Sequence, residues 1–367
     1  MMGGVTVKTK KIVALTVIIV MIGLISVYTS SHIWAFYKYD DAFYYIKRQV
    51  IFACLGFIAM FVTSRIDYHL YKKYYRLILM ICFVLLILVL IPGIGVVRGG
   101  SRSWFHLGFF ALQPSELFKI GIIIYTAVYI EKHYYQMKKI RYSFKILLIM
   151  GLGFLLIMLQ PDFGSGIVMA CGIIVMMIVS PFPFRYFVGL GIIGVIGIVV
   201  MILSAPYRME RILSFLNPFQ DPLGSGFQAI QALYAIGPGG LLGVGFDKSI
   251  QKHFYLPEPQ TDFIFAIVAE EFGFLGGIIL IGLYTSLLKT MLKISQNVPD
   301  LFGSFLMIGI TSMMGIQTLI NLGVVVGLFP VTGVTLPLMS YGGTSLVITL
   351  MSIGILINIS KSCRDVL

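Results

Sequence analysis

The chain has little charge. Only 11% of its 367 residues are Asp, Glu, Lys or Arg, and acids are the scarcer kind, with 15 Asp and Glu against 27 Lys and Arg. Soluble globular domains carry about 25% charged residues, so this composition excludes that class. Hydrophobic residues make up 58% of the chain and its mean hydropathy is +0.96. The sequence therefore predicts a polytopic membrane protein.

Cysteine is also scarce. Three of the four cysteines, Cys54, Cys82 and Cys171, fall in apolar runs, and Cys363 lies near the carboxyl end. Their spacing matches neither a disulfide framework nor a metal-binding motif. We therefore predict no metal site from sequence motifs.

About ten apolar runs approach the ~20 residues that a helix needs to cross a bilayer. Their approximate cores are residues 12–30, 49–64, 75–92, 115–131, 145–160, 163–180, 185–205, 261–284, 302–325 and 342–360. We expect an all-α polytopic membrane protein that forms a single transmembrane domain over residues 1–367. Its largest loop, residues 206–260, joins the seventh and eighth helices. Gly191, Gly194 and Gly197 of the seventh run are expected to serve helix packing.

The positive charges are unevenly distributed between alternate loops. If the amino terminus lies inside, most Lys and Arg residues fall in the cytoplasmic loops. The positive-inside rule then places both termini in the cytoplasm and residues 206–260 outside. This bias, together with anionic membrane lipid as a partner, accounts for the net charge of +12. No nucleic-acid partner is predicted.

An acid precedes the eighth apolar run. Asp262 follows two prolines, and either Thr261 or Asp262 could cap the helix that begins there. Small residues follow Asp262 at helical spacing, namely Ala266, Ala269, Gly273 and Gly277. Such a stripe would turn Asp262 toward the helix bundle. Two interpretations remain open: a helix cap at the membrane surface, or a carboxylate in an outward-facing cavity that can act as a base.

One lysine lies inside a predicted span. The segment Gln-Pro-Ser-Glu at residues 113–116 starts the fourth helix, and Lys119 follows Glu116 one turn later. An ammonium group within a bilayer is costly and is expected to have an acidic partner. Glu116 is the local candidate, and Asp262 is the long-range candidate.

The outer loops carry further candidate ligands. Arg98 and Arg102 could face phosphate, and Trp104 could offer a flat surface to a sugar ring. An interfacial hairpin with snorkelling arginines explains these residues equally well. In the largest loop, Arg208 and Arg211 are cations that could face an anionic ligand, as could Lys248, Lys252 and His253, and residues 237–245 are a glycine-rich run with weak evidence for phosphate binding. The tyrosines near residues 37–45 are interpreted as an interfacial aromatic belt.

Several motifs occur in a fixed order over nearly the whole chain. They are Arg-Gly-Gly-Ser-Arg-Ser-Trp at 98–104, Gln-Pro-Ser-Glu at 113–116 with Lys119, Gln-Pro-Asp-Phe-Gly at 160–164, Leu-Asn-Pro at 216–218, Asp-Pro-Leu-Gly-Ser-Gly at 221–226, Leu-Pro-Glu at 256–258, Thr-Asp-Phe-Ile-Phe-Ala at 261–266 and Ser-Tyr-Gly-Gly at 340–343. Together they resemble the SEDS family (shape, elongation, division and sporulation), the polytopic peptidoglycan glycosyltransferases.

Two segments resemble one branch of this family. Pro-Glu-Pro-Gln-Thr-Asp at 257–262 and Leu-Ser-Ala-Pro-Tyr-Arg at 203–208 are similar to the branch that contains stage V sporulation protein E. The division branch usually has Pro-Glu-Ala-His-Thr-Asp at the first of these segments. A role in the spore cortex or in the division septum is left open by these few positions.

The resemblance implies that Asp262 is the essential acid and that Lys119 lies near it. It also implies lipid II as substrate and a class B penicillin-binding protein, a transpeptidase, as partner. The expected reaction is glycan polymerisation on the outer face of the bacterial cytoplasmic membrane, with Asp262 as base and undecaprenyl pyrophosphate as leaving group. The residues expected at the site are Asp262 and Lys119 as catalytic groups, and Arg98, Arg102, Trp104, Glu116, Arg208, Arg211, Glu258 and Ser340 as substrate-binding groups. Glu258 could instead order the loop before Asp262, and a divalent cation such as Mg²⁺ or Mn²⁺ could assist the cations at the pyrophosphate.

Two other functions fit parts of the sequence. A lipid II flippase would share the polytopic fold, and Glu270 and Glu271, expected deeper in the same helix as Asp262, favour it. However, alternating access needs a midplane site, whereas the unusual polar residues crowd one side. A non-enzymatic scaffold for the division or cortex machinery would explain the loops but not Lys119.

Overall fold

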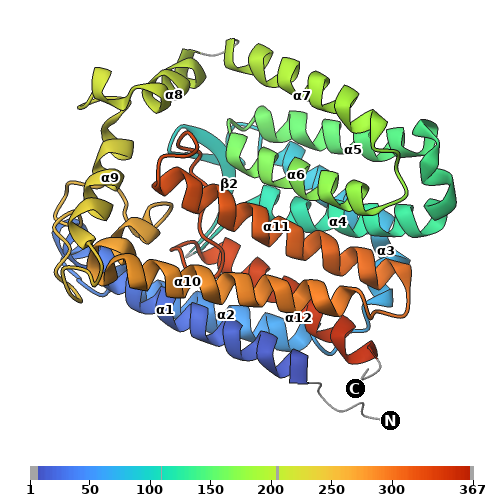
Figure 1. The fold of residues 1–367 in the computed structure, drawn as a ribbon, viewed down its shortest axis with the longest axis horizontal. Helices are drawn as coiled ribbons and strands as arrows, with labels where there is room; N and C mark the ends of the chain where they lie inside the picture. The colour runs from blue at the N-terminus through green and yellow to red at the C-terminus, as the bar shows by residue number, and fades with distance from the viewer. Residues whose placement is uncertain (1–6, 109, 204–205, 364–367) are drawn as a thin grey trace.

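The computed structural model describes residues 7–108, 110–203 and 206–363 as a bundle of long helices with one small sheet (Figure 1). The long helices are α1 (Val7–Tyr39), α2 (Tyr44–Thr63), α3 (His69–Leu88), α4 (Pro114–His133), α5 (Ile140–Met158), α6 (Phe163–Val179), α7 (Arg185–Leu203), α10 (Ile264–Ser295), α11 (Leu301–Val325) and α12 (Gly343–Ser362). Shorter helices are α8 (Pro206–Leu216), α9 (Phe227–Gly239) and the 3-10 turns η1 (Tyr134–Lys138) and η2 (Pro218–Gln220). Each predicted apolar run thus contains one long helix.

Not every long helix is apolar enough to be a span by composition alone. Among the described residues, α1, α2, α5, α10, α11 and α12 are long and apolar enough to cross a membrane. α6 is apolar but has 17 residues, and α3 and α4 carry several charged side chains. The protein is therefore a polytopic membrane protein with at least six candidate spans, and the total of ten stays a prediction.

Helix α4 lies at the centre of the bundle. It contacts α3, α5, α6, α11 and α12, and Ile120, Ile122, Ile123 and Ile124 along it are almost fully buried. A helix that is apolar on all sides is covered on all sides by other helices. Lys119 therefore lies inside the protein and does not face lipid.

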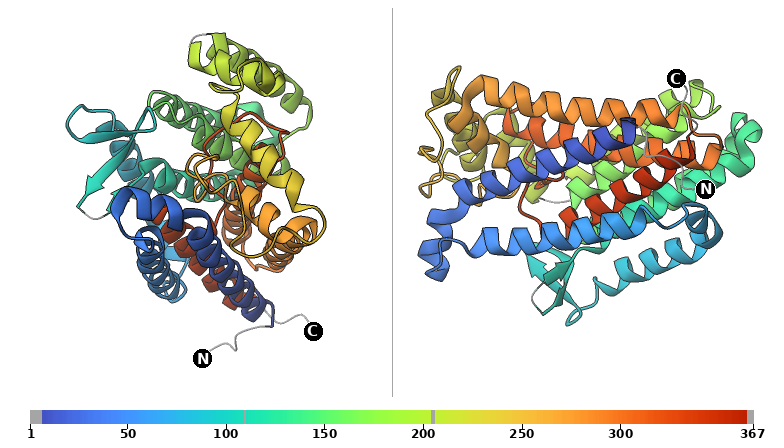
Figure 2. Two further views of the ribbon diagram at one scale, coloured as in Figure 1. Left: turned by 90° about the vertical axis from the view of Figure 1, so that its left-hand side faces the viewer. Right: turned by 90° about the horizontal axis from the view of Figure 1, so that it is seen from below.

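The segment before α4 forms a sheet, so the prediction of an all-α fold is wrong here. Strands β1 (Gly95–Arg98), β2 (Ser101–Leu107) and β3 (Phe110–Leu112) pair antiparallel in the order β1-β2-β3. Gly99 and Gly100 form the first turn with φ of 55° and 79°, which glycine adopts without steric cost. The sheet projects from the side of the bundle (Figure 2). It is anchored there because Ser101 donates to the carbonyl of Gln160 and Thr344 to that of Ala111.

Helix α7 lies at one edge of the bundle (Figures 1 and 2). A Cβ placed on Gly191, Gly194 or Gly197 would have no atom within 4 Å. The expectation that these glycines serve close helix packing is therefore wrong. Exposed side chains along α7, such as Val195 at 62%, would meet lipid in a membrane.

Both ends of the described chain lie at the same end of the bundle. The hydroxyls of Thr9 in α1 and Ser360 in α12 are 2.8 Å apart. Helices α8 and α9 and the loop after them lie at the opposite end (Figure 1). Placing the termini together agrees with the charge pattern, and the side of the membrane that they face stays a prediction.

Candidate functional site

Helix α10 is a candidate span but not one continuous helix, so the expectation of a single unbroken helix over residues 261–284 is wrong. Gly273 breaks it with φ 65° and ψ −163°, a conformation open essentially to glycine alone. A Cβ on Gly277 would lie only 3.4 Å from Phe265 Cζ, whereas residues twelve apart in a straight helix are about 18 Å apart. The chain therefore folds back at Gly273. Residues 264–272 form a short re-entrant helix that packs against residues 274–295.

Asp262 lies in the turn that leads into the re-entrant helix, and it is partly exposed. Its backbone carbonyl accepts a hydrogen bond of 2.7 Å from Asn321 Nδ2, which also lies 2.8 Å from the carbonyl of Val334. The hydroxyl of Thr261 is 2.8 Å from Asp262 Oδ1. The helix begins after Phe263 without a side-chain cap, so the prediction that Thr261 or Asp262 caps it is wrong. The carboxylate is left free for another role.

The surroundings of Asp262 adjust its acidity. Burial raises the pKa of Asp262 above its ordinary value, because desolvation disfavours the charged carboxylate. The hydrogen bond from Thr261 and the charge of Arg211 partly oppose this, and the charge of Glu258 adds to it. Arg211 is an exposed residue of α8 whose Nη1 donates to the carbonyl of Val331 at 3.1 Å. Two other predicted site residues, Arg211 and Glu258, are thus near enough for their charges to act on the Asp262 carboxylate.

Lys119 is paired with Glu116 and not with Asp262. Its ammonium group lies 2.7 Å from Glu116 Oε1 and 3.0 Å from Gln317 Oε1, and its side chain is 2% exposed. Of the two partners predicted for Lys119, the structure selects Glu116. Gln317 lies one helical turn from Asn321 on α11, so Lys119 and Asp262 are held by neighbouring positions of the same helix. Lys119 is therefore near Asp262 but does not form an ion pair with it.

The uncharged segment between α11 and α12 forms one wall beside Asp262. Gln317 donates to the carbonyl of Thr335 at 3.1 Å, and the amide of Tyr341 donates to the carbonyl of Gln260 at 2.8 Å. Ser340 is 4% exposed, and its hydroxyl accepts a hydrogen bond of 2.8 Å from the amide of Leu336. Ser340, predicted to bind substrate, thus stabilises the fold of this wall.

The remaining predicted site residues belong to the sheet and to α8. Arg102 of β2 is partly buried and reaches the carbonyl of Leu90 at 3.5 Å, and Trp104 lies two residues further along the same strand, also partly buried. Arg98 ends β1 and Arg208 lies in α8, but their side chains are not among the described parts. Residues 204–205 of the sporulation-type segment also lie outside the described residues.

A group of aromatic residues missed by the sequence analysis lies next to the site. Tyr45 packs edge-on against Tyr341, with ring centroids 5.0 Å apart. Tyr39 stacks on Tyr44 at 3.7 Å, and the guanidinium of Arg48 lies 4.4 Å from the Tyr44 ring. Tyrosines at a membrane interface predicted only an aromatic belt, because their contact with Tyr341 spans almost 300 residues of sequence.

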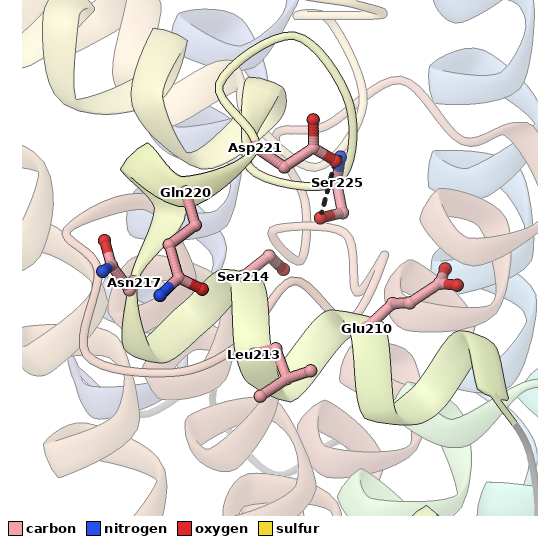
Figure 3. Close-up of a pocket in the computed structure, with 7 residues that line it drawn as sticks. All are labelled: Glu210, Leu213, Ser214, Asn217, Gln220, Asp221 and Ser225. Carbon is pink, nitrogen blue, oxygen red and sulfur yellow. Dashed lines mark hydrogen bonds between the residues drawn. The ribbon is translucent and has the colours of Figure 1, made fainter.

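A small pocket lies elsewhere, between residues 210 and 225. Its cavity volume is about 170 Å³, and it is lined by Glu210, Leu213, Ser214, Asn217, Gln220, Asp221 and Ser225 (Figure 3). Asp221 bonds the amide of Ser225 at 2.8 Å, which orders the turn. The pocket contains none of the predicted site residues and is smaller than the ~300–1,000 Å³ typical of ligand sites. We therefore place the candidate site at Asp262.

Comparison with known proteins supports the resemblance. The model of the cell cycle protein family of FtsW, RodA and SpoVE matches residues 10–365. The chain belongs to the SEDS family. Stage V sporulation protein E of Bacillus subtilis is 51% identical over 354 residues, which cover 96% of this SEDS chain and 97% of that protein. The probable peptidoglycan glycosyltransferase FtsW of Geobacter sp. (strain M18) is 38% identical, with 96% of each chain covered.

Solved structures of similar proteins share the fold. A chain from a peptidoglycan synthase complex, solved in work on the coordination of polymerization and crosslinking, matches this SEDS protein with a TM-score of 0.80 and 32% identity, over 95% of this chain and 96% of that one. The rod shape determining protein RodA of Thermus thermophilus matches with a TM-score of 0.70 and 26% identity, over 96% and 97%. The helical architecture described above is therefore that of the family.

Proposed function

We propose that this protein is a peptidoglycan glycosyltransferase that polymerises lipid II on the outer face of the bacterial cytoplasmic membrane. Family membership supports this, as do the probable glycosyltransferases among its relatives. The observation that carries the proposal is the setting of Asp262. Its carboxylate forms no ion pair among the described residues, and the pKa of the carboxylate is raised. The backbone carbonyl of Asp262 itself is held by a hydrogen bond from Asn321. A base with a raised pKa in a fixed position suits proton abstraction from a hydroxyl group.

The proposed reaction uses a single base, Asp262, on the acceptor side of the donor sugar. Asp262 takes the proton of the acceptor's 4-hydroxyl as that oxygen attacks the donor's anomeric carbon. The bond between that carbon and the pyrophosphate oxygen breaks, and undecaprenyl pyrophosphate leaves with the electron pair. A single displacement of this kind inverts the anomeric centre and needs no second carboxylate as nucleophile. The proton ends on Asp262 and passes to solvent.

The leaving pyrophosphate needs positive charge. Arg211 is the described cation whose charge acts on Asp262, and Arg98, Arg102 and Arg208 are further candidates from the sequence. Lys119 is already neutralised by Glu116, so we assign it the role of fixing α4 to α11. Within the described residues no group of three or more His, Cys, Asp or Glu residues could hold a metal ion. A divalent cation would therefore arrive with the substrate, held by its pyrophosphate oxygens and one or two carboxylates.

The proposed partner is a class B penicillin-binding protein that crosslinks the new glycan. The similar chain in a peptidoglycan synthase complex supports such an assembly. The proposed topology places both termini in the cytoplasm and Asp262 on the outer side. The cellular role is synthesis of spore cortex or of septal wall.

Fluorescent lipid II tests the proposal. The purified protein with its partner is expected to make long glycan, and Asp262→Asn, folded by size-exclusion chromatography, is expected to make none. Asp41→Asn is the matched control. Asp41 is a loop carboxylate near the same end of the bundle as Asp262, and it binds Lys47 at 2.8 Å. The control is expected to retain wild-type activity. Absence of glycan from the wild type with its partner would contradict the proposal.

The purified protein in liposomes that contain fluorescent lipid II tests the alternative of a lipid II flippase. That alternative relied on Glu270 and Glu271 lying deeper in the span than Asp262. Both carboxylates bind groups of residues 206–260, because Glu270 binds Ser249 and Glu271 binds Lys252, and these contacts do not support a transport role. Lipid II crossing the bilayer without glycan formation would favour the flippase. If neither glycan formation nor lipid II transport is observed, the non-enzymatic scaffold is the alternative that remains.

A further inference from the structure

Two adjacent acids on the re-entrant helix are completely buried. Glu270 and Glu271 are 0% and 1% exposed, yet neither is used in the reaction above. The carboxylate of Glu270 accepts three hydrogen bonds from one short stretch of the outer loop. These come from Ser249 Oγ at 2.5 Å, the amide of Ile250 at 2.8 Å and the amide of Gln251 at 3.4 Å. One side chain thus binds the outer loop to the helix that follows Asp262.

The backbone of the same loop completes the helix at its break. A helix end leaves amides and carbonyls without partners, and residues 240–245 supply these partners on both sides of Gly273. The bonds run from the amides of Val244 and Gly245 to the carbonyls of Glu270 and Glu271 at 2.9 and 3.1 Å, and from the amides of Phe274 and Leu275 to the carbonyls of Gly240 and Leu241 at 2.9 and 3.1 Å. The glycine run considered for phosphate binding therefore contacts helix backbone.

A lysine of the loop offsets part of the negative charge of this cluster. Lys252 is 1% exposed, and its ammonium group lies 2.6 Å from the carbonyl of Asp247 and 3.4 Å from Glu271 Oε1. It also contacts the carboxylate of Asp247. Lys252 therefore offsets part of the negative charge of Asp247 and Glu271 and is not presented to a ligand, which corrects the expectation from sequence. The loop and the re-entrant helix form one connected unit.

We propose that Glu270 is a positioning residue for Asp262, an inference that rests on the function proposed above. Glu270 lies near one end of the re-entrant helix and Asp262 just before the other, eight positions apart along the chain, or roughly 12 Å at the helical rise. A tilt of about 5° at the Glu270 end then moves Asp262 by ~1 Å, and a displacement of that size can slow a reaction about 100-fold. Glu270 restrains this tilt by binding residues 249–251.

Polymerisation kinetics provide the first test. Glu270→Gln keeps the shape of the side chain but presents an amide donor to a set of donors, so at least one of them loses its acceptor. We expect kcat to fall about 10-fold with KM for lipid II unchanged, because the substrate contacts are intact. Glu131→Gln is the matched control, since Glu131 binds Lys72 at 2.7 Å at the far end of α4 from Glu116. An unchanged kcat, or a raised KM alone, would overturn the proposal.

Hydrogen exchange tests the positioning without relying on activity. Glu270→Gln is expected to speed amide exchange in residues 255–262 as well as in residues 245–252, while exchange in α12 stays unchanged. Faster exchange confined to residues 245–252 would show that Glu270 does not control the Asp262 turn, even in an active polymerase. If the wild type makes no glycan, the proposed function fails and exchange still decides this inference. Should Glu270→Gln not fold, Ser249→Ala removes one of the three bonds and is expected to give the same changes at smaller size.

Discussion

At the scale of single residues, the buried pair of Lys119 and Glu116 should change the free energy of unfolding differently in single and double variants. Two charges that are 2% and 9% exposed gain little net stability as a pair, but removing one leaves the other uncompensated. Lys119→Met alone is expected to destabilise the protein by about 3–5 kcal/mol. Adding Glu116→Gln to it should recover most of that loss. Denaturant unfolding in detergent measures both, and a double variant as unstable as the single one would contradict this account.

The acidity of Asp262 predicts the pH dependence of polymerisation. The base must be ionised, so activity is lost as pH falls through its pKa, which burial raises above the ordinary value of 3.8. The charge of Arg211 lowers this pKa and that of Glu258 raises it. Arg211→Gln should therefore move the acid limb of the kcat profile to higher pH, and Glu258→Gln should move it to lower pH. Shifts in the same direction for both variants would show that the limb reports another group.

The scarcity of charge explains why two site residues were predictable. Asp262 and Lys119 are anomalies in an apolar sequence, and each pointed to a specific environment. Gln317 and Asn321 were missed because neutral amides inside an apolar run are weaker signals. Their partners are also backbone carbonyls of Thr335, Val334 and Asp262, which no side-chain motif reveals.

At the scale of elements, Gly273 is the position on which the re-entrant helix depends. An added Cβ would lie 2.3 Å from the amide nitrogen of Gly243, and the backbone conformation itself is strained for other residues by about 1–3 kcal/mol. Gly273→Ala is therefore expected to lower stability by at least that amount and to reduce activity strongly. Gly282→Ala, in the return part of α10 with nothing within 4 Å, is the control and should be neutral or mildly stabilising. Thermal unfolding and polymerisation measure the two effects.

Alanine in place of a glycine of α7 should affect stability in the opposite direction to Gly273→Ala. Gly191→Ala and Gly194→Ala meet no neighbouring atom within the protein, so each should stabilise the helix by up to about 1 kcal/mol through its higher propensity. Gly153 of α5 gives the contrast, because its added Cβ would lie 2.3 Å from the ring of Phe118. Gly153→Ala should destabilise the protein. Equal melting temperatures for all three variants would argue against the peripheral position of α7.

Helices and strands differed in how well the sequence predicted them. Long apolar runs predicted all ten long helices, because bilayer thickness sets their length. The strands were not predicted, since β3 has 3 residues and β1 has 4 among glycines and arginines that weaken any alternation. The break at Gly273 escaped detection because the run is apolar on both sides of it. The conformation of Gly273 and the contact of Gly277 with Phe265 reveal the break only in three dimensions.

At the scale of the whole molecule, both termini lie at one end of the bundle and helices α8 and α9 at the other. Cysteines placed at these two ends should therefore be labelled from opposite sides of the membrane. Tyr135, between α4 and α5, is 85% exposed, and Ser225 is exposed in the outer loop. In a variant without native cysteines, Ser225→Cys should react with a membrane-impermeant maleimide in intact cells. Tyr135→Cys should react only after permeabilisation. The reverse pattern would place Asp262 on the cytoplasmic side and exclude polymerisation outside.

The connection of Asp262 to α11 and to the segment after it has a consequence for biosynthesis. A ribosome delivers the chain from its amino end, so Asp262 is made 59 residues before Asn321 and 79 residues before Tyr341. Its holding partners are Asn321 and, through Gln260, the amide of Tyr341. Until those parts have entered the membrane, the nascent polypeptide contains the proposed base without its geometry. We therefore expect the protein to gain activity only after α11 and the segment that follows it are in place.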